Sequence, residues 1–82
     1  MQVKNGEALC EEFCDNFSVG SKLIERDYLF KRVEEVKCNL DVEFFPELMQ
    51  RMMALGYCCT QVQKDAKKNK CTAWFEEKTE GV

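Results

Sequence analysis

The chain has no histidine at any of its 82 positions. Histidine is the most versatile acid–base group near neutral pH and the usual partner of a serine or cysteine nucleophile, so its absence excludes those catalytic pairs and every imidazole metal site. The sequence also lacks a Gly-rich phosphate-binding loop. Pairs of carboxylates such as Glu11 and Asp15 lie on a predicted solvated helix face. We therefore expect a protein that is not an enzyme and needs no cofactor.

Long apolar runs are absent as well. No stretch approaches the roughly 20 apolar residues that cross a bilayer, and the N-terminus has no apolar signal-peptide core. The net charge of -3, from 12 basic and 15 acidic residues, is too small to indicate a nucleic-acid-binding surface by itself. We expect no contact with a membrane. The expected location is the cytoplasm, or the extracellular space if the cysteines form disulfides.

The six cysteines are the most unusual part of the composition. An even number in a short chain allows a disulfide framework, but the few glycines, the single proline and the helical patterning favour reduced thiols in a hydrophobic core. A four-thiolate zinc site made of Cys10, Cys14, Cys38 and one later cysteine is an alternative. Cys58 and Cys59 are adjacent on a predicted strand, where they would point to opposite faces. The prediction is that the protein has no metal site.

Three segments have the apolar spacing of helices, over residues 6–17, 22–38 and 46–55. Pro46 suits the first turn of the third helix and Gly56 its end. Strand-favouring residues follow at 57–62 and 71–76, on either side of a lysine-rich turn. The predicted fold is α+β, with a three-helix bundle packed on a C-terminal β-hairpin in one small globular domain, 1–82. This is a winged-helix-like order of elements.

Aromatic and methionine side chains in the second half of the chain exceed the obvious needs of one small core, and such residues are enriched at protein interfaces. With catalytic groups absent, we expect a small regulatory or inhibitory protein that binds a larger protein, a class that includes virus- or phage-encoded inhibitors of host enzymes. Homo-oligomers are compatible with this expectation. The predicted partner-binding residues are Phe44, Phe45, Gln50, Arg51, Tyr57 and Trp74.

Two other functions are compatible with the sequence. A winged-helix-like protein would use its basic hairpin turn to contact nucleic acid or an acidic partner, through Lys64, Lys67, Lys68 and Lys70. Arg51 is the single cation on the predicted third helix, which makes that helix a poor reader of DNA. The second alternative is a secreted helical protein stapled by disulfides.

Overall fold

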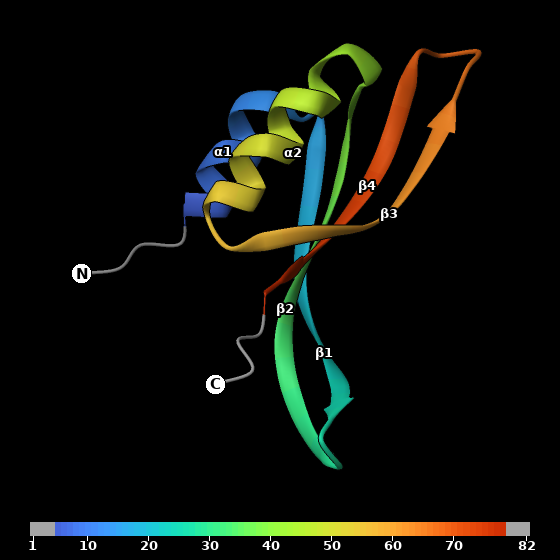
Figure 1. Ribbon diagram of the computed structural model, residues 1–82. Coiled ribbons are helices and arrows are strands. Elements are labelled where there is room, and N and C mark those ends of the chain that lie inside the picture. The colour runs from blue at the N-terminus through green and yellow to red at the C-terminus, as the bar shows by residue number, and fades with distance from the viewer. Residues whose placement is uncertain (1–4, 79–82) are drawn as a thin grey trace.

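The computed structural model describes residues 5–78 of the chain (Figure 1). These residues form two α-helices, one short 3₁₀ helix and four strands. In chain order the elements are α1 (Asn5–Phe13), β1 (Asn16–Arg26), β2 (Leu29–Asp41), η1 (Val42–Phe44), α2 (Phe45–Ala54), β3 (Tyr57–Asp65) and β4 (Lys70–Glu77).

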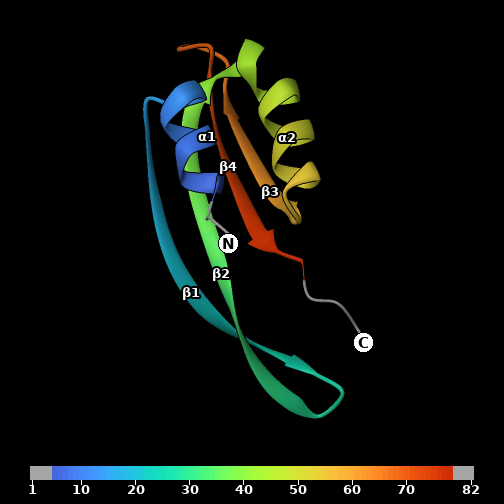
Figure 2. The ribbon, with the colours of Figure 1, turned by 90° about the vertical axis from the view of Figure 1, so that its left-hand side faces the viewer.

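The four strands form one antiparallel sheet in the order β1-β2-β4-β3. Each hairpin therefore contributes one central and one edge strand, and β2 pairs with β4 in the middle. Both helices lie side by side on the same face of the sheet (Figure 2). Within residues 5–78, the opposite face is covered by no other element.

The hydrophobic core lies between the helices and the two central strands. Side chains alternate along β2 and β4, so every second residue points toward the helices. The fully or almost fully buried residues of this cluster are Cys10, Val36, Cys38, Leu40, Leu48, Met52, Tyr57, Cys71, Ala73 and Phe75. The partners on the other side of β2, including Lys37 and Asn39, remain partly or fully exposed.

The prediction of a three-helix bundle is wrong, and so is the winged-helix-like order of elements. The segment 22–38, predicted as the second helix, forms most of the hairpin of β1 and β2. Asp27 and Tyr28 both have positive φ, 55° and 66°, and Arg26 pairs with Leu29 across them. A two-residue turn with two left-handed residues matches the right-handed twist of paired strands, so it sets the hairpin register. The fold is a sheet-dominated α+β fold.

Other predicted elements are confirmed. Pro46 lies in the first turn of α2, and Gly56 follows the helix with a φ of 99°, a conformation that glycine adopts without steric cost. The C-terminal hairpin consists of β3 and β4, with a register shift between Cys59 and Gln61. Asn69 has a φ of 57° just before β4. These local signals were strong enough to fix the second half of the chain.

The hairpin of β1 and β2 extends beyond the rest of the sheet. β2 pairs with β4 only from Glu35 to Asp41, whereas β1 pairs with β2 all the way to the turn. Residues 21–34 are therefore a two-stranded extension, which we call the hairpin arm. In Figure 1 it runs downward past the ends of both helices. Most side chains of the arm are exposed, although Val33, near its base, is buried.

Candidate functional site

The end of the hairpin arm carries four large apolar side chains that are exposed. Tyr28 is 93% exposed, Leu29 71%, Phe30 68% and Leu23 55%. We call these four residues the apolar tip. Single exposed hydrophobic residues are common on proteins, whereas several large ones gathered at one end of the molecule are typical of an interaction site. The apolar tip is therefore the strongest candidate for a binding site in the described part of the chain.

The register of the hairpin explains why Leu23 and Phe30 are uncovered, whereas Leu29, next to Phe30 on the strand, points to the opposite face. Leu23 pairs with Arg32 and Phe30 pairs with Glu25, so Leu23 and Phe30 share one face of the arm. Because side chains alternate, this is the face on which Val36 points into the core further along β2. The apolar face thus continues past the helices that cover it elsewhere. What is core at one end of the hairpin is surface at the other.

Polar contacts fix the base of the arm. The Tyr57 hydroxyl donates a hydrogen bond to the Glu34 carboxylate on the helix-covered face. Burial, and then this hydrogen bond, raise the pKa of Tyr57 above its usual value. On the open face, the Lys22 ammonium pairs with Glu76 and lies 3.4 Å from the Glu35 carboxylate. Contacts on both faces therefore hold the arm to the sheet.

The structure does not bring the six predicted partner-binding residues onto one surface. Tyr57 is 7% exposed and belongs to the core, and the partly buried Phe45 packs against that core. Phe44 is exposed beside Phe13, with their ring centroids 6.4 Å apart. Trp74 lies on the open face of the sheet, 5.6 Å from the Lys37 ammonium. Any contact of these residues with a partner stays a prediction.

Gln50 and Arg51 are both exposed on α2. The Arg51 guanidinium lies 3.0 Å from the Glu47 carboxylate and 5.6 Å from the centre of the Phe13 ring. Arg51 also lines a groove of about 360 Å³ between the two helices, together with Leu9. The groove is lined by residues of α1 and α2 and of the segment just after α2, and no residue of the hairpin arm lines it.

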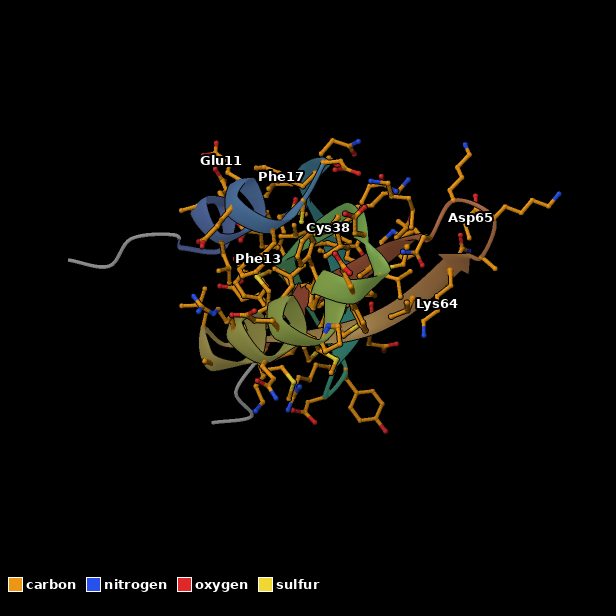
Figure 3. The ribbon with its side chains drawn as sticks, turned by 90° about the horizontal axis from the view of Figure 1, so that it is seen from above. Glu11, Phe13, Phe17, Cys38, Lys64 and Asp65 are labelled. Carbon is orange, nitrogen blue, oxygen red and sulfur yellow. The ribbon has the colours of Figure 1, made fainter. Side chains whose placement is uncertain are left out.

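The four predicted lysines do gather at one end of the molecule. Lys64, Lys67, Lys68 and Lys70 line an open cleft of about 750 Å³ at the turn between β3 and β4. Figure 3 shows Lys64 and the neighbouring Asp65 at this end. The Lys70 ammonium lies 2.5 Å from both the Asp15 and Asp41 carboxylates, so its charge is neutralised locally. A nucleic-acid or acidic-partner contact at this turn stays a prediction.

All six cysteine thiols are free in the structure, and three of them form a cluster. Cys10 lies in α1, Cys14 directly after it, and Cys38 in β2. Their sulfur atoms all lie within 4.8 Å of one another, and the Cys10 and Cys38 sulfurs are 3.2 Å apart. Cys10 and Cys38 are fully buried, whereas Cys14 is partly exposed. Figure 3 shows Cys38 near the labelled Phe13 and Phe17.

The three thiols change one another's protonation. Hydrogen bonds from Cys14 and then Cys38 lower the pKa of the Cys10 thiol to about 4. The hydrogen bond with Cys10 raises the pKa of Cys14 to about 12, and the same type of contact raises that of Cys38. The physical cause is that one thiolate is stabilised by two S–H donors, whereas a second negative charge at this distance is repelled. The cluster therefore loses one proton much more easily than the next.

Comparisons with known proteins give no further guidance: no family model, no curated protein and no solved structure matches this chain. Across residues 5–78, neither helix has the length and hydrophobicity that a membrane crossing requires. The candidate sites therefore stand on their own geometry.

Sequence reasoning missed the apolar tip because its residues were assigned to a helix. The run Tyr28, Leu29 and Phe30 interrupts helical spacing with three consecutive large apolar residues, which no single helix face accommodates. That run was the available signal. The same reasoning did note Cys10, Cys14 and Cys38 as possible members of one thiolate site, and the structure brings these three together.

Proposed function

We propose that this protein acts without catalysis, as a small regulatory or inhibitory protein that binds a larger protein through the apolar tip of its hairpin arm. The observation that carries the proposal is the exposure of Tyr28, Leu29 and Phe30 at the end of a projecting two-stranded arm. Exposing three large apolar side chains costs free energy in water, and a partner surface that buries them recovers it.

The side chains near the apolar tip indicate the kind of partner surface that would bind it. Charged residues of both signs surround the apolar tip, among them Glu25, Arg26, Asp27, Lys31 and Arg32. Aromatic side chains in the centre of a contact and charges around its rim are typical of protein interfaces. We therefore expect a partner groove with an apolar floor and a rim that carries both acidic and basic groups.

The size of the tip limits the strength of the contact. An aromatic side chain buries about 150–250 Å² when it is fully enclosed, so the tip alone contributes an area at the low end of specific interfaces. Such a contact suits reversible regulation. A small protein that occupies a groove in this way can block it without any chemistry of its own.

The test uses the full chain with a photo-crosslinking amino acid in place of Tyr28, exposed to extract from the source cells. A double variant, Leu29→Ser with Phe30→Ser, removes most of the tip. The matched control is Met53→Ser with Leu55→Ser, which removes two other exposed apolar side chains near the end of α2. Melting temperatures of all forms establish that each one folds.

We expect one dominant crosslinked protein. Its yield should be the same for the chain without further substitutions and for the control, and at least about tenfold lower for the tip variant. Equal retention by the tip variant would show that the apolar tip is not the binding surface. Sedimentation of the purified chain covers self-association: a dimer that the tip variant abolishes would show that the occupant is a second copy and would contradict a larger partner.

A further inference from the structure

The cluster of Cys10, Cys14 and Cys38 has the composition of a metal site. Cys10 lies in α1, Cys14 directly after it and Cys38 in β2, and the mutual distances of at most 4.8 Å between their sulfur atoms allow all three to reach one ion. The Cys14 amide donates to the Cys10 carbonyl at 2.8 Å, so the helical turn continues and holds both side chains on the same side. β2 then supplies Cys38 from the facing layer.

The distances fit coordination better than a disulfide. A thiolate binds zinc at about 2.3 Å, which places two sulfurs on one such ion about 3.8 Å apart. The Cys10 and Cys38 sulfurs are 3.2 Å apart and the others no more than 4.8 Å apart, so shifts of about 1 Å or less are sufficient. A disulfide bond is only about 2.0 Å long and would leave the third thiol without a role.

The donor set selects the ion. Thiolates favour soft metals such as Cu(I) and zinc, and the group contains sulfur donors only. Zinc generally needs four ligands, but within residues 5–78 this cluster offers three. Three thiolates complete a trigonal shell around Cu(I). Phe17, the cross-strand neighbour of Cys38, packs on the same core beside the cluster.

We propose that Cys10, Cys14 and Cys38 form a three-thiolate binding site for one Cu(I) ion. Each sulfur coordinates the ion as a thiolate, any proton that it still carries is released to solvent, and no electron is transferred. The two buried sulfurs hold the ion in the core. Cys14 is partly exposed, so the ion can enter the site from solvent at this side chain. The site is independent of the apolar tip.

The test titrates the reduced full-length chain with Cu(I), with oxygen excluded and a coloured Cu(I) chelator as competitor. The informative variant is Cys14→Ser, because a partly exposed side chain can be changed with little effect on the core. The matched control is Cys58→Ser, which alters another partly exposed cysteine, on the open face of β3. Melting temperatures measured without metal establish that both variants fold.

We expect one Cu(I) per chain, three sulfur neighbours by X-ray absorption, and at least about tenfold weaker binding in Cys14→Ser but not in Cys58→Ser. Equal affinity of Cys14→Ser and wild type would overturn the site, as would no uptake at all. In a second arm, Zn(II) that outcompetes Cu(I) would overturn the choice of ion. An intact mass that reveals a native Cys10–Cys38 disulfide would also refute the proposal.

Discussion

Two phenylalanines provide the sharpest test of the division between core and hairpin arm. Phe75 is fully buried on the central strand β4, whereas Phe30 is 68% exposed on the arm. Replacing a fully buried phenylalanine with alanine costs about 3–5 kcal/mol, from the lost burial and the cavity left behind. For Phe30→Ala we expect less than about 1 kcal/mol, because little apolar area is lost and strand preference changes only slightly.

The cost of Phe75→Ala is large relative to the total free energy of unfolding. A domain of this length has a free energy of unfolding of about 4–12 kcal/mol, so Phe75→Ala removes a large share of it. With a shift of about 4–8 °C per kcal/mol, its melting temperature should fall by at least about 12 °C. Phe75→Leu, which keeps most of the volume, should lose only about 1.5 kcal/mol or less. Urea unfolding followed by circular dichroism measures all three variants.

The comparison also separates the observed fold from the helix that spacing predicts for residues 22–38. On that helix Phe30 would flank the apolar line and pack into the core. A cost for Phe30→Ala close to that of Phe75→Ala would therefore refute the exposed arm. Such a result would also remove the basis for the proposed binding surface.

Two further predictions concern charges and hydroxyls. Because the folded state raises the pKa of Tyr57, its neutral form stabilises the fold fully below about pH 10 and this stability is lost as pH rises toward the folded pKa. Above about pH 10, the melting temperature should therefore fall less steeply with rising pH for Tyr57→Phe than for wild type. The same dependence of melting temperature on pH in both proteins would contradict the contact with Glu34. Replacing Lys70 with Met leaves Asp15 and Asp41 without their shared cation, so the melting temperature at neutral pH should fall by a few degrees in low salt and less in high salt. A deficit of the same size in low and high salt would indicate lost packing instead.

The second half of the fold could be predicted because its signals are local. A proline in the first helical turn and a glycine just after the helix restrict the backbone by themselves, as Pro46 and Gly56 show. Tyr57 and Trp74 belong to residue types that favour strands. None of these arguments needs to know what packs against the segment.

The prediction for the first half of the chain failed because the same residues fit both a helical and a strand pattern of apolar positions. Leu29, Val33, Val36 and Leu40 recur at helical spacing, yet the stretch 36–41 also alternates strictly between apolar and polar side chains. Pairing with β4 and burial under the helices decide in favour of the strand. That choice depends on tertiary contacts, which spacing along the chain does not contain.

The candidate sites also depend partly on local sequence spacing and partly on tertiary contacts. Cys10 and Cys14 share a helix face because they are four residues apart, which the sequence shows directly. Their meeting with Cys38 requires the order of strands in the sheet. The apolar tip likewise depends on the turn at Asp27 and Tyr28. Both residues have positive φ angles, but neither is a glycine, so the sequence contains no clear signal for this turn.

The order of the strands has a consequence for the molecule as a whole. Each half of the chain is a helix followed by a hairpin, and β1-β2-β4-β3 places the two halves about an approximate twofold axis between β2 and β4. The axis sends the two hairpin turns to opposite poles, as Figure 1 shows. One pole bears Tyr28 and its apolar neighbours, and the other bears Lys67 and Lys68. The nearly symmetric arrangement of elements thus has two chemically different ends, one with exposed apolar side chains and one with lysines.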